Sequence, residues 1–121
     1  MNNNLFLKRI EKESKDWNNF ETEITYNETN VVILFKKINF KVICGEHYPF
    51  RAPKVLVKDK EYNIYLNELQ YSNSLNKQIK KMLNIECLCC ESLLCPNNWK
   101  PSKKIIDIVR QYLYFNSLFF V

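Results

Sequence analysis

The chain has 121 residues, 46% of them hydrophobic, which is enough to form one compact domain with its own core over residues 1–121. A single glycine, Gly45, cannot supply a glycine-rich nucleotide loop, so the composition argues against direct ATP or NAD chemistry. The net charge of +5 comes from scattered lysines and not from a concentrated basic stripe, so we expect no nucleic-acid partner.

The first half of the chain predicts one helix followed by strands. Residues 5–17 place an apolar face between charged side chains at helical spacing. Its members are Phe6, Ile10 and Trp17. Four β-favouring segments follow, at residues 20–26, 31–35, 38–42 and 55–57. Their connections are mostly short and polar, which favours neighbouring strands, so we expect a four-stranded antiparallel meander sheet.

The second half of the chain predicts less regular structure. The alternation of Tyr62, Ile64 and Leu66 predicts a short fifth strand or an extended edge. Residues 73–83 predict a short helix, and a cysteine-bearing loop follows. Ser102 is a suitable N-cap for a last helix over residues 105–113. The predicted fold class is therefore α+β, with a helix at the start, the meander sheet, the cysteine loop and a C-terminal helix.

Cysteine usage and apolar segments indicate the compartment. Five cysteines are an odd number, and four of them fall between residues 87 and 95, which suits a reducing compartment better than a disulfide framework. The N-terminus has no apolar stretch of signal-peptide length. The apolar tail 105–121 is interrupted by Asp107 and Arg110 and is shorter than a bilayer span of about 20 residues. We therefore expect a cytoplasmic protein with no membrane partner.

Three separated segments carry the most specific signal. They are Leu7-Lys8-Arg9-Ile10-Glu11-Lys12-Glu13, then Tyr48-Pro49-Phe50-Arg51-Ala52-Pro53-Lys54-Val55, then Cys87-Leu88 followed by Trp99-Lys100-Pro101-Ser102. In type, order and position they resemble the opening helix, the Tyr-Pro-Phe signature and the Cys-Leu and Trp-x-Pro segments of ubiquitin-conjugating enzymes. The resemblance covers almost the whole chain and implies a ubiquitin-conjugating-like fold. The many asparagines and lysines are typical of an AT-rich genome and fit a divergent member of viral or protist type, in a host's cytoplasm if viral.

The resemblance implies a thioester-forming enzyme. Ubiquitin or a ubiquitin-like protein would pass from an activating enzyme to a cysteine, and then to a lysine amine. Cys87 is the implied acceptor because Leu88 completes the family's Cys-Leu pair. Cys90 is the runner-up because its distance to Trp99 is closer to the usual interval. No cofactor or bound metal is implied.

The resemblance also implies a surface for a ubiquitin ligase. Its residues would be Lys8, Arg9, Phe50, Arg51, Lys100, Pro101 and Ser102. From the residues alone, Tyr48 and Phe50 flank Pro49 on an extended backbone and must point in different directions, so one ring can pack inward while the other is exposed. The alternative, in which both aromatic rings belong to the core, stays open.

Two features depart from the family. The His-Pro-Asn motif, whose asparagine stabilises the oxyanion, is absent from the chain. Asn76 and Asn84 do not match it by context, and Asn97, Asn98 or backbone donors are candidate substitutes. The chain also has a single predicted helix after Trp-x-Pro, which implies a C-terminally shortened member. The apolar face of that helix continues through Phe115, Leu118, Phe119, Phe120 and Val121, which predicts an interface with a second copy or a partner.

Other interpretations stay open for function and for the cysteines. The domain could be a non-catalytic ubiquitin-conjugating-like or RWD-like interaction domain, or a small zinc-stabilised interaction protein. Zinc ligands would come from Cys87, Cys89, Cys90 and Cys95, with His47 as a further candidate. Otherwise we expect the cysteines at 89, 90 and 95 to be buried small hydrophobes.

Three more side chains have structural expectations. Cys44 lies on an alternating strand face and is predicted to be core. His47, the one histidine, is predicted to lie on the surface, because it has no orienting partner for general-base work. Trp99, between two prolines and before an apolar helix, is predicted to anchor its loop on the core.

Overall fold

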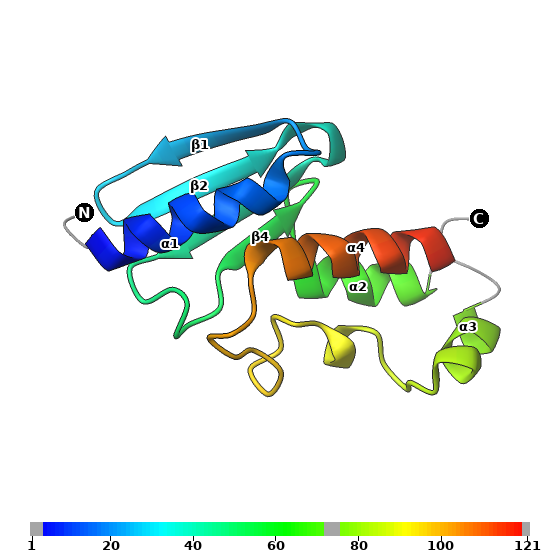
Figure 1. Cartoon of the computed structure of the whole chain (residues 1–121). Helices are drawn as coiled ribbons and strands as arrows, with labels where there is room; N and C mark the ends of the chain where they lie inside the picture. Colours follow the sequence, from blue (N-terminus) through cyan, green and yellow to red (C-terminus); the bar gives the residue numbers. More distant parts are fainter. Residues whose placement is uncertain (1–3, 72–75, 120–121) are drawn as a thin grey trace.

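The computed structural model describes residues 4–71 and 76–119, and it confirms an α+β fold with an N-terminal helix, an antiparallel sheet and a C-terminal helix (Figure 1). The helices are α1 (Asn4–Ser14), α2 (Tyr62–Tyr71), α3 (Asn76–Leu83) and α4 (Ile105–Phe119). The strands are β1 (Thr22–Tyr26), β2 (Asn30–Phe35), β3 (Phe40–Gly45), β4 (Lys54–Val57) and β5 (Lys60–Glu61). They pair in chain order, so the expected meander gains a fifth, two-residue strand at one edge.

One face of the sheet forms the floor of the core. Side chains alternate between buried and more exposed along β2, β3 and β4, as the two-residue period of a strand requires. The buried ones are Val31, Ile33, Phe35, Phe40, Val42, Cys44, Val55 and Val57. Trp17, in the 3₁₀ turn that continues α1, packs edge-on against Phe35 at a ring distance of 5.6 Å. From α4, the ring of Tyr112 lies 5.1 Å from that of Phe40. Helices from both ends of the chain therefore cover the same face.

The strand expected over Tyr62 to Leu66 is wrong, because these residues open helix α2. The side chains that α2 buries are Tyr62, Tyr65, Leu66, Leu69 and Gln70, which follow the helical spacing of three and four residues. Ile64, which suggested alternation, is 53% exposed. Two tyrosine hydroxyls bind α2 to α4. Tyr62 donates to Gln111 at 3.0 Å, and Tyr65 donates to Asn116 at 2.7 Å.

The turn between β4 and β5 is a two-residue hairpin. Lys58 and Asp59 both adopt positive φ, 51° and 68°, the backbone that a tight turn of this kind requires. Lys60 follows the turn directly and pairs with Val57 in β5. This hairpin reverses the chain and sends it directly into α2.

Helix α3 falls within the predicted range 73–83, of which residues 73–75 lie outside the described part. The helix ends in a left-handed cap at Asn84 (φ 58°), whose N–H donates to Lys81 O, while Ile85 N–H donates to Lys80 O. This pair of bonds is the Schellman arrangement, in which asparagine is the usual substitute for glycine. Asn84 is therefore a structural residue at the entrance to the cysteine loop.

The expected N-cap of the last helix is wrong, because α4 begins at Ile105, three residues beyond Ser102. Its first free N–H, that of Ile105, instead donates to the buried carboxylate of Glu13 on α1 at 2.8 Å. Farther along α4, Phe115 is buried and Leu118 packs against the chain's own core. Phe120 and Val121 lie outside the described residues, as does the side chain of Phe119, and the interface with a second copy stays a prediction. No helix in the described ranges is long and apolar enough to cross a bilayer.

Candidate functional site

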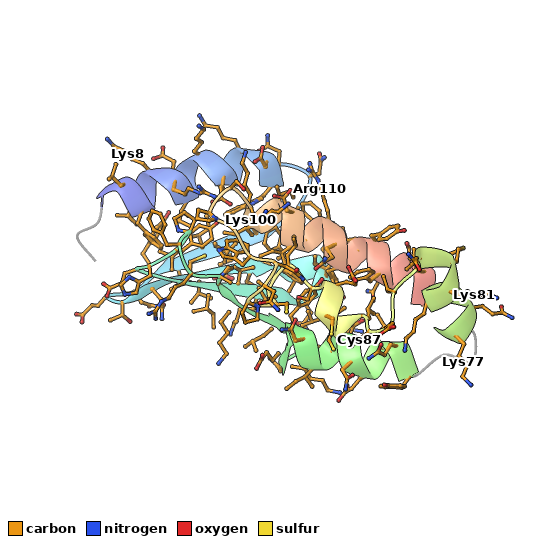
Figure 2. The ribbon with its side chains drawn as sticks, turned by 90° about the horizontal axis from the view of Figure 1, so that it is seen from below. Lys8, Lys77, Lys81, Cys87, Lys100 and Arg110 are labelled. Carbon is orange, nitrogen blue, oxygen red and sulfur yellow. The ribbon has the colours of Figure 1, made fainter. Side chains whose placement is uncertain are left out.

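Four of the five cysteines lie in the loop that connects α3 to α4, beneath α2. Cys44 is separate: it is fully buried on β3, as expected, and burial raises the pKa of its thiol strongly. Figure 2 shows Cys87 in this loop beside α2, far from Lys8 on α1. The loop therefore holds four of the five thiols, and its conformation decides how exposed each one is.

Cys87, Cys89 and Cys90 form one cluster, which we call the cysteine triad. Their three Sγ atoms lie within 4.8 Å of one another, and the Sγ atoms of Cys87 and Cys89 are 2.7 Å apart. A short 3₁₀ helix, Cys89–Glu91, turns the backbone so that side chains one to three residues apart converge. Cys87 and Cys89 are half-buried and Cys90 is exposed. The triad is thus a surface feature that solvent and a partner can reach.

Gln70, on α2, holds the triad's backbone in place. Its side chain is buried, and its Oε1 accepts a hydrogen bond of 3.0 Å from Leu88 N–H, between the first two cysteines. Its Nε2 donates to Asn67 Oδ1 at 2.8 Å and lies 3.8 Å from Cys87 Sγ. Leu88 itself is fully buried. The side-chain amide of Gln70 therefore holds the Leu88 backbone by a hydrogen bond, while the buried leucine side chain packs the loop against the core.

The thiols of the triad differ in acidity. The hydrogen bond with Cys89 is the main cause that lowers the pKa of Cys87 to about 7, helped by the backbone N–H of Cys90 and by Gln70. The same contact raises the pKa of Cys89 to about 11, and the neighbouring Cys87 raises the pKa of Cys90. Cys87 is therefore the first of the three thiols to become a thiolate.

The structure corrects the expectation of three buried small hydrophobes, because none of Cys89, Cys90 and Cys95 is fully buried. Cys90 was expected to be a buried small hydrophobe and is instead an exposed residue of the 3₁₀ helix Cys89–Glu91. Cys89 is half-buried and packs against the core. Cys95 is half-buried outside the triad, and its carbonyl accepts hydrogen bonds from the N–H groups of Asn98 and Trp99. His47 is exposed, as expected, and is not part of the triad either.

Of the two candidate asparagines that follow the triad, Asn98 has a structural role. Asn98 Nδ2 donates to Cys90 O at 2.8 Å and to Ser92 O at 2.9 Å, so its amide ties the end of the triad to the following turn. Asn97 is exposed. The side-chain amide that lies against Cys87 is that of Gln70, whose Nε2 is 3.8 Å from the sulfur. Sequence reasoning missed this residue, because it lies 17 positions before Cys87 in a segment assigned to no helix; the helical spacing of α2 was the available signal.

A second cluster joins α1, the Tyr-Pro-Phe segment and the Trp-x-Pro loop, and we call it the Tyr48 junction. Tyr48 is buried and donates its hydroxyl to Glu13 Oε2 at 2.5 Å. Arg9 bonds Glu13 Oε2 at 2.8 Å and also donates to Lys103 O at 2.8 Å, and its guanidinium lies over the Tyr48 ring. Trp99 donates its indole N–H to Pro49 O at 2.7 Å. Trp99 thus anchors its loop as expected, and three segments far apart in sequence meet here.

The residues expected to meet a ligase lie around this junction and are mostly exposed. Phe50 is 79% exposed while Tyr48 is 3% exposed, so the two rings do point in different directions and the alternative with both rings in the core is wrong. Exposure is shared by Lys8, Arg51, Lys100, Pro101 and Ser102. Arg9 differs from them, because Glu13 and Lys103 O already engage its guanidinium.

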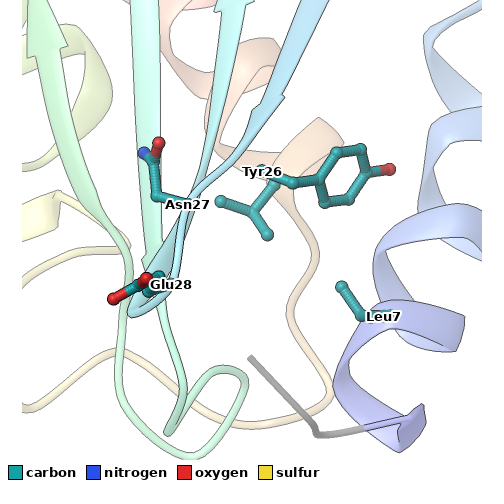
Figure 3. A pocket seen from close by; sticks show the side chains of 5 residues that line it. Leu7, Tyr26, Asn27 and Glu28 are labelled. Atoms are coloured by element: carbon teal, nitrogen blue, oxygen red, sulfur yellow. The ribbon is translucent and has the colours of Figure 1, made fainter.

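A hollow lies between α1 and the β1–β2 turn (Figure 3). Its lining residues are Leu7, Tyr26, Asn27, Glu28 and Val31. These five supply one carboxylate and no thiol or imidazole, so this hollow lacks the nucleophile or metal ligands that the cysteine triad offers.

Replacing Gln70 tests its role as the support of the triad. Gln70→Leu keeps the size and removes the acceptor for Leu88 N–H, which leaves a buried donor unpaired at a cost of about 1 to 3 kcal/mol. We expect urea unfolding to show that loss, and amide exchange at Leu88 to accelerate. Gln78→Leu, at an exposed position of α3, is the matched control and should stay within about 0.5 kcal/mol of the parent. Equal stability of the two variants would contradict the supporting role.

Comparisons with known proteins do not assign the chain to a family. A scan against protein-family models found no match, and neither did a search of curated proteins nor a search of solved structures.

Proposed function

We propose that the protein is a divergent ubiquitin-conjugating enzyme that accepts ubiquitin, or a ubiquitin-like protein, as a thioester on Cys87. One observation carries the proposal: parts of all three segments that resemble this family contact one another in the fold. Helix α1, the Tyr-Pro-Phe segment and the Trp-x-Pro loop join at the Tyr48 junction. The loop that ends in Trp99 presents a half-exposed thiol at Cys87, followed by the buried Leu88.

The chemistry requires only this thiol from the chain. The Cys87 thiolate attacks the carbonyl carbon of the modifier's C-terminus, which the activating enzyme holds as a thioester. A new carbon–sulfur bond forms and the old one breaks, so the activating enzyme's sulfur leaves as a thiolate. A lysine amine then attacks the Cys87 thioester, an amide bond forms, Cys87 leaves as a thiolate, and the amine loses its proton to solvent or a base.

The surroundings of Cys87 support acceptance of a bulky protein ester. A half-buried thiol on a surface loop is accessible, while Gln70 and Leu88 hold the adjacent backbone. Gln70 acts as a positioning residue in this proposal, because its amide lies against the sulfur and the Leu88 N–H. No residue is assigned to the oxyanion, since the described contacts of Asn98 commit its amide to backbone carbonyls.

A charging assay tests the proposal directly. The full chain is incubated with activating enzyme, ATP and ubiquitin, and in parallel with other ubiquitin-like proteins and their activating enzymes. We expect an ATP-dependent adduct that thiol reductant removes. A folded chain that charges with none of these modifiers would overturn the enzymatic proposal and favour the non-catalytic interaction domain.

Phe50→Ala tests the proposed ligase surface. The ring is 79% exposed, so its truncation should leave the free energy of unfolding within about 0.5 kcal/mol of the parent. An exposed interface aromatic commonly contributes about 2 kcal/mol or more to binding, so ligase-stimulated discharge should fall at least tenfold. Discharge to free lysine in the absence of ligase measures the chemistry separately and should persist.

Tyr26→Ala is the matched control, because Tyr26 is a 60% exposed aromatic on edge strand β1. It should retain ligase-stimulated discharge. If both variants lose discharge equally, or neither does, the surface around Phe50 is not the ligase site.

A further inference from the structure

The cysteine triad has the composition of a metal site. Three sulfur ligands come from four consecutive residues, and their Sγ atoms lie within 4.8 Å of one another. Cys87 and Cys90 have the Cys-x-x-Cys spacing at which two thiolates can chelate one metal ion, and Cys89 adds a third sulfur from the same turn. Among the described residues, no other histidine, cysteine, aspartate or glutamate belongs to this group.

The dimensions of the triad match a thiolate-bound cation after a small adjustment. Zinc–sulfur bonds of about 2.3 Å at tetrahedral angles place neighbouring sulfurs about 3.8 Å apart. The upper bound of 4.8 Å within the triad admits this spacing. The closest pair, Cys87 and Cys89 at 2.7 Å, has to separate by about 1 Å, which side-chain rotation on a surface loop can provide.

The donor set and its exposure define the class of metal. Thiolate sulfur prefers soft or borderline cations and disfavours Mg²⁺ and Ca²⁺, which take oxygen ligands. Cys90 is exposed, so the fourth position of a tetrahedral ion can open to solvent. The backbone is already held, because Gln70 fixes Leu88 N–H between the first two ligands.

We propose that Cys87, Cys89 and Cys90 form a three-thiolate site for a soft or borderline divalent cation such as Zn²⁺, with the fourth position open to solvent. The ligand set is smaller than the sequence suggested, because Cys95 and His47 lie outside the triad. The binding site stands on the arrangement of sulfurs alone. One consequence of the metal site rests on the proposed function. A metal ion bound to Cys87 blocks thioester formation there, so metal binding and ubiquitin charging exclude each other.

The competition between metal binding and charging is measured in the charging assay with Zn²⁺ added. Cys87 should stop accepting ubiquitin, and a chelator should restore the adduct. The thioester of the activating enzyme itself, resolved on the same gel, controls for zinc acting on that enzyme. Zinc that leaves Cys87 charging intact at saturation would show that metal and thioester do not compete.

The metal site itself is tested without ubiquitin, so its failure is distinguishable from failure of the proposed function. Reduced, metal-free full chain is titrated with Cd²⁺, whose charge-transfer absorption reports thiolate ligands, in the presence of a competing carboxylate chelator. We expect one equivalent to bind and Zn²⁺ to displace it. Cys87→Ser, Cys89→Ser and Cys90→Ser should each weaken binding at least tenfold, while Cys95→Ser, a matched change in the same loop, should retain it. Circular dichroism checks that each variant is folded.

Full-strength binding in any of the three triad variants would overturn the proposed ligand set. Equal loss in Cys95→Ser, or no competitive binding by the parent, would overturn it as well.

Discussion

Cys87→Ser should abolish the reductant-sensitive ubiquitin adduct, leaving either no adduct or a reductant-resistant oxyester. The reason is chemical: a serine hydroxyl is a far weaker nucleophile than a thiolate and forms an ester that thiols do not cleave. The change of one atom on a half-exposed side chain should preserve the fold. Gel analysis with and without reductant, after charging with activating enzyme and ATP, measures the outcome.

Cys95→Ser is the control for this substitution, because Cys95 is a half-buried thiol of the same loop that lies outside the triad. It should charge like the parent. The assignment to Cys87 is wrong if Cys87→Ser still forms a thioester and Cys90→Ser does not, which would move the acceptor to the exposed runner-up.

Glu13→Ala should produce the largest loss of stability that we expect from a single substitution. The carboxylate is 3% exposed and serves Arg9, the Tyr48 hydroxyl and the Ile105 N–H at once. Its removal leaves the Tyr48 hydroxyl and the Ile105 N–H without this acceptor, while the Arg9 guanidinium keeps its hydrogen bond to Lys103 O. A buried donor left without its acceptor typically costs about 1 to 3 kcal/mol, so the loss of two such bonds should lower the free energy of unfolding by at least about 2 kcal/mol. Urea unfolding of parent and variant measures the difference.

Glu11→Ala is the matched control, an exposed carboxylate on the same helix, and should change stability by no more than about 0.5 kcal/mol. Both variants remove one negative charge from α1, so a difference in stability between them reports the contacts of Glu13 in the Tyr48 junction. If Glu13→Ala unfolds at the parent's urea concentration, the Tyr48 junction does not hold α1, the Tyr-Pro-Phe segment and α4 together.

The sequence by itself determined the elements in which one pattern of apolar residues extends over many positions and fits only one type of secondary structure. The apolar positions of α1 and α4 repeat at helical spacing, and Val31 to Phe35 is an uninterrupted β-favouring run between polar segments, so the order helix, meander, loop and helix was predictable. The split between Tyr48 and Phe50 was expected from the sequence, but the extended backbone behind that expectation was wrong, because side chains two residues apart on a strand share a face. The two rings separate because residues 46–50 form a turn.

The sequence prediction was wrong for a short segment whose apolar spacing fits both the two-residue period of a strand and the 3.6-residue period of a helix. Tyr62, Ile64 and Leu66 fit a strand, yet Tyr62, Leu66 and Leu69 fit a helix equally well. Docking on α4 decides the matter, because the tyrosine hydroxyls find acceptors there that are 49 and 51 positions away in the chain. Local sequence carries no information about such partners.

The candidate site was predictable in its residues and not in its arrangement. The four clustered cysteines mark the loop, but which of them converge depends on the 3₁₀ turn at Cys89–Glu91 and on Gln70 from α2. The same holds for Glu13, which reads as one more charge on an amphipathic helix until Tyr48 and Ile105 bury it. Tertiary structure alone decided these roles, because burying a polar group is costly unless distant parts of the chain supply its hydrogen bonds.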